Sequence, residues 1–246
     1  MDSAPSKLDV PPRYEAIRSL GIGGGGEVWE VRDCLTNTHL ALKVLSGKAG
    51  QREADALVRE VVALSGLEGL GLPRILHLGR LPKSDRLYVL RELVDGESLD
   101  RCAASDPVAC MVALAEAATQ LTVIHRGGLL HGDIKPANII LCRNGGVTLV
   151  DLGLATPWID GGVLPEGLTP RYAAPELLHG RPLTVRSEIY SLGFILGELL
   201  GNAQEQLESA RAANLKSIAT RATALDAAAR HPSADEFASE LRLALG

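Results

Sequence analysis

Hydrophobic and polar positions follow a strand-like pattern along the first third of the chain. Over residues 14–45, short runs rich in β-branched residues are separated by glycine, which predicts strands in YEAIRSLG, EVWEVRD and THLALKVL. Residues 51–66 carry apolar side chains on one side and charges on the other, which predicts an amphipathic helix that ends at Gly66. Two more strands, RILHLGRL and RLYVLREL, are expected on either side of a turn at Pro82–Asp85.

After Asp95-Gly96 the spacing of apolar residues becomes mainly helical. Asp106-Pro107 opens a helix whose apolar residues recur every three or four positions. Two short strands, NIILC and VTLVD, flank the hairpin signal Asn144-Gly145-Gly146. Two or three further helices are predicted over residues 187–200, about 203–225 and 233–245, the last with Ser233 as its N-cap.

This change of pattern divides the chain into a strand-rich part and a helix-rich part, an α+β organisation. We predict a flexible leader over residues 1–13, which are polar and carry three prolines, then a lobe over 14–94 and a helical lobe over 95–246. A hinge is expected near Glu92–Gly96. Residues 154–175 form a long loop with four prolines, and loops of that length inside compact domains are usually functional.

The composition describes a folded chain with no obvious attraction to nucleic acid. The 246 residues are 46% hydrophobic and 22% charged with a net charge of −5, so neither disorder nor a nucleic-acid partner is expected. No apolar run reaches the roughly 18 residues that span a bilayer, so no membrane segment is predicted, and no signal peptide is evident. The four cysteines form no CxxC pair, which indicates reduced thiols and a cytoplasmic location.

A glycine-rich segment links the first two predicted strands. It fits the pattern G-x-G-x-x-G-x-V through Gly21, Ile22, Gly23, Gly24, Gly25, Gly26 and Val28. Glycine lets backbone N–H groups approach phosphate oxygens without a Cβ in the way. Taken alone, four consecutive glycines fit the tip of a flexible hairpin equally well.

Charged residues follow at positions suited to phosphate chemistry. Lys43 lies on a predicted strand and Glu60 in the helix after it. Each alone is more simply explained as a solvent-facing charge, but together they have the residue types for an ion pair that directs the ammonium group at a phosphate.

A second group of polar residues follows His131. Asp133 can accept a proton from an attacking hydroxyl, Lys135 can neutralise a transferring phosphoryl group, and the carbonyl of Asn138 can hold magnesium. Asp151 ends the second short strand and is placed to bind a metal, although an aspartate before glycine is alone more often a turn former.

Together these segments resemble the eukaryotic-like serine/threonine protein kinase family. The glycine loop, Lys43, Glu60, the HGD sequence with its asparagine, and DLG fall in that family's order. LTPRYAAPE is similar to its G-T-P-x-Y-x-A-P-E segment, SEIYSLGFILGELL resembles its helix F, and Arg230 resembles the arginine that pairs with the glutamate of A-P-E, here Glu176. The resemblance covers nearly the whole chain and implies the two-lobed kinase fold.

The resemblance also implies a reaction, the transfer of the γ-phosphoryl group of Mg-ATP to serine or threonine hydroxyls of protein substrates. Asp133 would orient the hydroxyl, Lys135 would steady the γ-phosphate, and Asn138 and Asp151 would hold Mg²⁺. The implied nucleotide site comprises Gly21 to Gly26, Val28, Ala41, Lys43 fixed by Glu60, Glu92, Val94 and Ile140.

Two other functions remain open at this level. A pseudokinase scaffold would keep the fold without transfer. A small-molecule kinase of the aminoglycoside phosphotransferase type shares HGD and the asparagine, but generally lacks the T-P-x-Y-x-A-P-E segment and seldom has a residue like Lys135. The chain is also compatible with being one module of a longer protein with a fusion or regulatory partner.

The sequence departs from the family at four places. Gly132 replaces an arginine, Leu152 a phenylalanine, and Glu188 the helix-F aspartate that accepts catalytic-loop N–H groups. Arg91 falls just before the expected hinge, where the family usually has an apolar or hydroxyl residue. A buried arginine needs a carboxylate partner, so either Arg91 pairs inside or the register assigned to this segment is off by one. The segment for helix G is short. Because Gly132 has no side chain to pair with a phosphate, activity is expected not to depend on activation-loop phosphorylation, for which Thr156 is a poorly placed acceptor.

Overall fold

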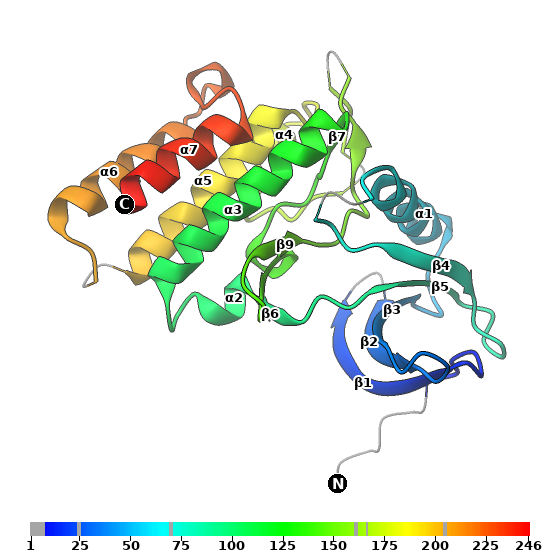
Figure 1. The fold of residues 1–246 in the computed structure, drawn as a ribbon. Coiled ribbons are helices and arrows are strands. Elements are labelled where there is room, and N and C mark those ends of the chain that lie inside the picture. The colour runs from blue at the N-terminus through cyan, green and yellow to red at the C-terminus, as the bar shows by residue number, and fades with distance from the viewer. Residues whose placement is uncertain (1–7, 24–25, 69–70, 160–161, 166, 204–205) are drawn as a thin grey trace, which may run out of the picture. The chain divides into compact units, whose positions relative to one another are not determined.

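The structure is a computed structural model that describes residues 8–23, 26–68, 71–159, 162–165, 167–203 and 206–246. The chain divides into two compact units, Met1–Glu68 with Pro73–Val94 and Gly69–Leu72 with Asp95–Gly246 (Figure 1). The division after Val94 lies where the sequence pattern changes. Gly71 and Leu72, which had been assigned to the first lobe, belong with the second unit, where the carbonyl of Gly71 accepts a hydrogen bond from Gln120 at 3.2 Å.

The first unit is built on an antiparallel sheet with strand order β1-β2-β3-β5-β4. Its elements are β1 (Tyr14–Gly23), β2 (Gly26–Asp33), β3 (His39–Leu45), α1 (Gln51–Gly66), β4 (Ile75–Arg80) and β5 (Leu87–Glu92). These bounds confirm the strands and the helix that the sequence predicted.

The two faces of strand β3 pack against different parts of the first unit. Leu40, Leu42 and Val44 are buried in one core cluster together with side chains of β2 and β5. On the other face Leu45 and Val89 pack against Leu57 of α1. Because successive side chains of a strand point to opposite faces, Ala41 and Lys43 lie on the face that α1 covers.

The described part of the predicted leader is not loose. Leu8 and Val10 pack against the sheet's core cluster, and the carboxylate of Asp9 accepts the N–H groups of Lys83 at 2.7 Å and Ser84 at 3.0 Å. The prediction was wrong for residues 8–13 because it weighed their polar composition and not contacts with a distant turn. Residues 1–7 lie outside the described residues.

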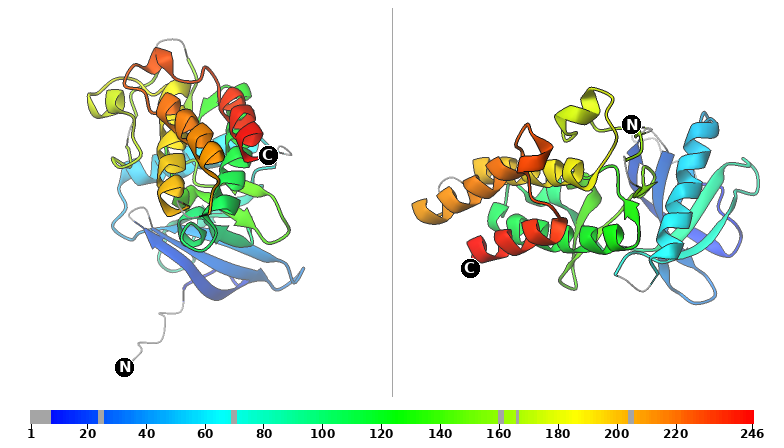
Figure 2. Two further views of the ribbon diagram at one scale, coloured as in Figure 1. Left: turned by 90° about the vertical axis from the view of Figure 1, so that its left-hand side faces the viewer. Right: turned by 90° about the horizontal axis from the view of Figure 1, so that it is seen from above.

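The second unit is built around the buried helix α3 (Pro107–Arg126). The Asp106 carboxylate caps it by accepting the N–H of Ala109 at 2.9 Å, as the sequence predicted. By length and composition α3 could cross a membrane, but 61% of its most apolar window is buried inside the unit, as in a core helix. The helices α5 (Val185–Asn202) and α7 (Ala234–Leu245) pack against α3, and α6 (Ser209–Ala222) packs against α5 and α7 (Figure 2).

The helix predicted over about 203–225 is shorter than expected. It begins at Ser209, and none of the described residues between α5 and α6 is helical. Within the described residues, this part of the unit therefore holds no counterpart of helix G.

Short elements complete the second unit and carry most of its polar site. A three-stranded sheet has the order β6-β8-β9, and β7 pairs with β10. The bounds are β6 (Gly96–Ser98), α2 (Leu99–Cys102), β7 (Leu129–Leu130), η1 (Pro136–Asn138), β8 (Ile139–Cys142), β9 (Val147–Leu149), β10 (Thr156–Pro157), α4 (Pro175–Leu178) and η2 (Ala227–Ala229). The predicted hairpin between β8 and β9 is confirmed.

Candidate active site

Two paired strands, β1 and β2, flank the glycine loop, as the sequence predicted. Gly23 at the end of β1 pairs with Gly26 at the start of β2, whereas Gly24 and Gly25 lie outside the described residues. Gly26 has φ of +146°, and a Cβ there would lie 2.1 Å from the carbonyl oxygen of Val44. Only glycine fits at this close approach. That the loop covers phosphates stays a prediction, as does the adenine contact assigned to Val28, which is half-buried on β2.

Lys43 and Glu60 form the predicted ion pair within the first unit. The ammonium nitrogen of Lys43 lies 2.6 Å from Oε2 of Glu60, whose side chain projects from α1 and is fully buried. Buried charges are held in place when a partner satisfies them. The pair therefore fixes the direction of the Lys43 side chain, as a phosphate-binding lysine requires.

Arg91 on β5 is also buried and has the carboxylate partner that the sequence required. It sits opposite Ala41 in the β3–β5 register, its side chain is 9% exposed, and Nη1 lies 3.6 Å from Oε1 of Glu60. Glu60 thus faces two cations. Glu92, on the hinge side of Arg91, is exposed instead of buried, and its carboxylate accepts hydrogen bonds from the N–H and Nε of Arg74. The nucleotide-binding roles of Glu92 and Val94 stay predictions.

In the second unit, the carboxylate of Asp133 is held at both oxygens. Nζ of Lys135 lies 2.5 Å from Oδ2, and the hydroxyl of Thr169 donates to Oδ1 at 2.7 Å. Nζ of Lys135 also donates to Oγ1 of Thr169 at 3.3 Å. The carboxylate is thereby oriented while remaining half-buried rather than sealed, which suits a group that meets a substrate hydroxyl.

Asn138 and Asp151 stand at the two sides of the β8–β9 hairpin. The amide Nδ2 of Asn138 donates to the carbonyl oxygen of Asp133 at 2.9 Å, so its amide oxygen is the atom left for a cation. The N–H of Val150 donates to the carbonyl of Asn138 at 3.0 Å, which ties the segment before Asp151 to the catalytic loop. Asp151 has φ of +65°, a left-handed conformation that is uncommon for residues other than glycine, although aspartate and asparagine adopt it more often than most.

These two residues fit magnesium by the chemistry of their donors. Mg²⁺ prefers oxygen ligands and is usually held by one or two protein groups together with substrate phosphates. The described residues contain no group of three or more His, Cys, Asp or Glu side chains that could hold a metal by themselves. A site completed by phosphate oxygens agrees with both facts.

Glu188 anchors the catalytic loop from α5. Its Oε1 accepts the N–H of Gly132 at 2.7 Å, as predicted, and its Oε2 lies 2.7 Å from Nε2 of His125 on α3. The extra methylene compared with aspartate lets the carboxylate reach both partners. His125 was not predicted as a functional residue, because its only signal in the sequence is a histidine near the end of a mainly apolar helix.

Gly132 is required by its surroundings. Its φ is +85°, and an added Cβ would lie 2.3 Å from the carbonyl oxygen of Leu154 and 2.9 Å from the adjoining carbon. Real Cβ atoms do not approach backbone so closely, so the missing arginine could not be restored without moving the chain at Leu154.

Glu176 and Arg230 form the ion pair that the sequence predicted. Nη1 and Nη2 of Arg230 lie 2.7 Å and 2.9 Å from the two carboxylate oxygens, and the arginine is 1% exposed. Burial works to raise the pKa of Glu176, but the hydrogen bonds and positive charge of Arg230, together with further hydrogen bonds including one from Ser187, outweigh it and the pKa lies below its ordinary value. The pair ties the segment before α4 to the loop before α7.

Comparisons with known proteins agree with this arrangement. The family model described as the protein kinase domain matches residues 14–242. The serine/threonine-protein kinase PknJ of Mycobacterium tuberculosis is 34% identical over 198 residues, which cover 76% of this chain and 33% of PknJ. The DNA damage-responsive serine/threonine-protein kinase RqkA of Deinococcus radiodurans is 31% identical over 194 residues, which cover 75% of this chain and 29% of RqkA.

A solved structure extends the likeness to the fold. The crystal structure of the Mycobacterium tuberculosis PknI kinase domain matches with a TM-score of 0.72 and 25% identity, covering 98% of this chain and all of that domain. The matched region is about a third of the length of the curated relatives. The family model, the relatives and the fold agree, and the chain belongs to the protein kinase family, with the α+β kinase fold and serine/threonine kinases as its relatives.

Proposed function

We propose that this chain is an active kinase that transfers the γ-phosphoryl group of ATP to serine or threonine hydroxyls of proteins. The observation that carries the proposal is the Asp133 carboxylate, which Lys135 and Thr169 hold at its two oxygens. An aspartate so fixed can accept the proton of a substrate hydroxyl, and the nearby ammonium group can balance the charge of the transferring phosphoryl group. Lysine two residues after the aspartate is typical of serine/threonine kinases.

Mg²⁺ is part of the proposal. Asn138, through its amide oxygen, and Asp151 would hold the ion, which supplies neutralisation of the phosphate charges when bound. Lys43, directed by Glu60, would contact the α- and β-phosphates from the first unit.

The decisive experiment compares two aspartates of the second unit. Asp133→Asn should lower the rate of phosphate transfer from radiolabelled ATP to a generic basic protein by about a hundredfold or more, the scale of a lost general base. The control is Asp235→Asn in the first turn of α7, where the side chain is exposed, and its rate should equal that of wild type. Acid hydrolysis of the product should yield phosphoserine or phosphothreonine.

Two outcomes would replace the proposal. Nucleotide binding with no transfer to any protein would identify a pseudokinase. Transfer to a panel of small metabolites in preference to proteins would identify a small-molecule kinase.

Control is proposed to come from a partner or from sequence outside this chain, not from loop phosphorylation. Thr156 is buried, Thr169 is bonded to Asp133, and Gly132 has no side chain to receive a loop phosphate. Full dephosphorylation, and Thr156→Ala, should each change the initial rate by less than about tenfold, or roughly 1.4 kcal/mol of barrier. A larger drop would show that loop phosphorylation does matter.

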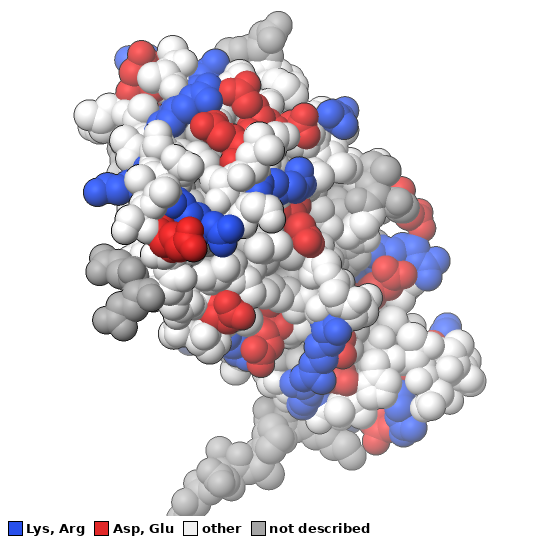
Figure 3. All heavy atoms as spheres, turned by 60° about the vertical axis from the view of Figure 1, so that its left-hand side comes forward, with Lys and Arg blue, Asp and Glu red and all other residues white. Residues whose placement is uncertain are grey.

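A cytoplasmic location is also a proposal, supported by four cysteines that are all free thiols. On the face drawn in Figure 3 acidic and basic side chains are intermingled. Cell fractionation with an antibody against the chain would test the location.

A further inference from the structure

Arg91 lies on the functional face of the sheet in the first unit. It is opposite Ala41, and its neighbour Val89 is opposite Lys43. Residues directly opposite each other in an antiparallel pair share a face, and Val89 packs against Leu57 of α1. Arg91, Lys43 and α1 therefore meet on one side of the sheet.

The carboxylate of Glu60 stands between two cations at that place. Its Oε2 accepts from Lys43 at 2.6 Å, and its Oε1 faces Nη1 of Arg91 at 3.6 Å. The second contact is an ion pair that is too long for a hydrogen bond. Oε1 of Glu60, and Nε and Nη1 of Arg91, are buried without a hydrogen-bond partner in the described part of the chain.

Such an arrangement is unfavourable for stability alone. A buried charge and buried donors without hydrogen bonds cost free energy, and an apolar residue at position 91 would avoid that cost, leaving Lys43 and Glu60 as a balanced pair. Buried polar groups that lack hydrogen bonds in an otherwise well-packed core are expected at residues that serve function.

We propose that Arg91 is a positioning residue that holds Glu60, and through it α1, against the sheet. With one cation on each oxygen, Glu60 cannot leave the sheet without stranding both Lys43 and Arg91 in a buried site. The inference rests on the proposed function only for the role given to Lys43.

This role would explain how the chain works without a phosphate-receiving arginine at position 132. In the proposed arrangement, the charges that hold the helix belong to the first unit itself. The position of α1 is then a fixed property of the fold and not the result of a modification.

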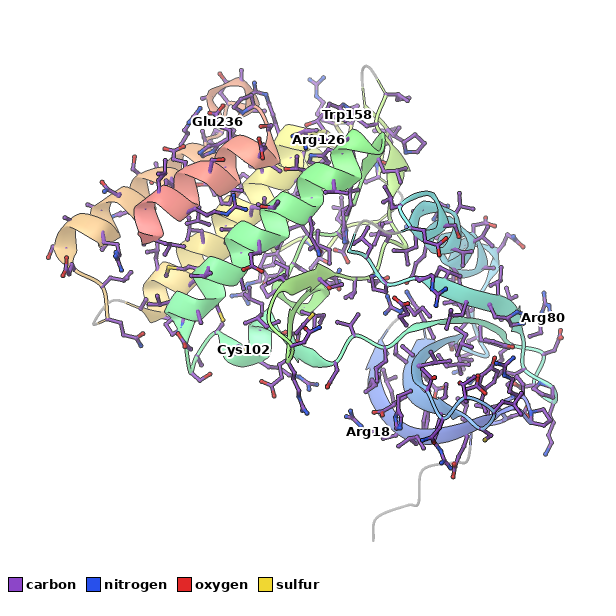
Figure 4. The ribbon with its side chains drawn as sticks, viewed as in Figure 1. Arg18, Arg80, Cys102, Arg126, Trp158 and Glu236 are labelled. Carbon is purple, nitrogen blue, oxygen red and sulfur yellow. The ribbon has the colours of Figure 1, made fainter. Side chains whose placement is uncertain are left out.

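Hydrogen–deuterium exchange of the full chain tests the proposal without requiring activity. Arg91→Met keeps the apolar stem and removes the charge, while Arg91→Lys keeps the charge. The control is Arg80→Met, which removes an exposed arginine at the hairpin end of β4 that pairs with Asp85 (Figure 4).

Arg91→Met should speed exchange in residues 57–66 of α1 by about tenfold or more, with an unchanged or higher Tm and unchanged exchange in β1 and β2. Arg91→Lys should restore most of the protection, and Arg80→Met should change nothing in α1. The KM for ATP of Arg91→Met should rise more than kcat falls, since Lys43 loses its fixed direction.

Two results would overturn the proposal. Unchanged α1 exchange in Arg91→Met would show that the arginine does not hold the helix. Faster exchange across the whole first unit with a lower Tm would show a residue that only supports the core. Absence of phosphate transfer in the wild type, with α1 exchange as expected, would overturn the proposed function and leave the positioning role intact.

Discussion

Two buried glutamates, Glu188 of the second unit and Glu60 of the first, each lie between two partners but are satisfied differently. Glu188, on α5 of the second unit, has a hydrogen bond of 2.7 Å at each oxygen, from the N–H of Gly132 and with Nε2 of His125. Glu60, on α1 of the first unit, has a hydrogen bond of 2.6 Å at one oxygen, while the other oxygen faces Arg91 at 3.6 Å.

The difference separates an anchor from a functional group. A fully hydrogen-bonded buried network is rigid and fixes one conformation, whereas a partly satisfied one keeps a cost in the folded state. Glu188 therefore holds the catalytic loop in one conformation. The contacts of Glu60 orient the side chain of Lys43, and they do so at some cost in folding stability.

The largest effect on stability is expected from Glu188→Ala. The change leaves the N–H of Gly132 and the imidazole of His125 buried without partners, and each such group costs about 1–3 kcal/mol. Urea unfolding should show a loss of about 3 kcal/mol. Glu188→Gln, which keeps an acceptor for Gly132, should lose less than half of that, and an unchanged midpoint in the alanine variant would remove Glu188 from the anchor.

A somewhat smaller loss is expected when a methyl group is added at Gly132. Gly132→Ala must bear both a left-handed backbone and the 2.3 Å approach to Leu154, whereas Gly145 has φ of +82° and open space around its Cβ position. Gly145→Ala should cost about 1 kcal/mol, the backbone penalty alone. Gly132→Ala should cost clearly more in thermal unfolding, and equal losses would mean that Leu154 yields easily.

A third paired carboxylate, the partly exposed Glu176, extends the comparison to the pH dependence of stability. The pKa of Glu176 lies below the ordinary value of 4.5, because the hydrogen bonds and charge of Arg230, together with further hydrogen bonds including one from Ser187, overcome the effect of burial. The stability it contributes is complete above that ordinary value and is lost as the pH falls through the lowered folded-state pKa.

Between pH 5 and pH 3, roughly the range around the carboxylate pKa values, the free energy of unfolding should fall less steeply for Glu176→Gln than for wild type. Glu208→Gln, at the exposed start of α6 where the side chain makes no cap hydrogen bond, should keep the wild-type slope. Parallel curves for all three proteins would show that the Glu176–Arg230 pair contributes nothing to acid stability.

The smallest effect on stability is expected from Lys43→Met, although phosphate transfer should fall by about a hundredfold or more. Glu60 keeps Arg91 as its partner, so the change does not leave an uncompensated buried charge, which would cost about 3–5 kcal/mol. The free energy of unfolding should change by less than about 1 kcal/mol. A loss near the larger value would mean that Arg91 does not compensate Glu60.

Local patterns in the sequence predicted the features that depend mainly on neighbouring residues, such as element bounds, a helix cap and a hairpin. The bounds of α1, the cap of α3 at Asp106 and the β8–β9 hairpin follow from neighbouring residues, and Lys43 with Glu60 from the order of motifs. The partnership of His125 with Glu188 joins residues 63 positions apart, and no local pattern indicates it. Likewise Arg91 required a buried carboxylate, but only the packing of α1 on β5 decides which one.

The close approach of Gly132 to Leu154 also bears on how this chain can change over evolutionary time. A single nucleotide substitution can convert a glycine codon into an arginine codon, so the missing arginine is near in the genetic code. It is remote in structure, because the carbonyl of Leu154 occupies the space where the new side chain would begin. A lineage with this backbone must remodel two segments together to regain the residue, and natural selection would therefore find new inputs elsewhere on the molecule sooner than it would restore the lost one.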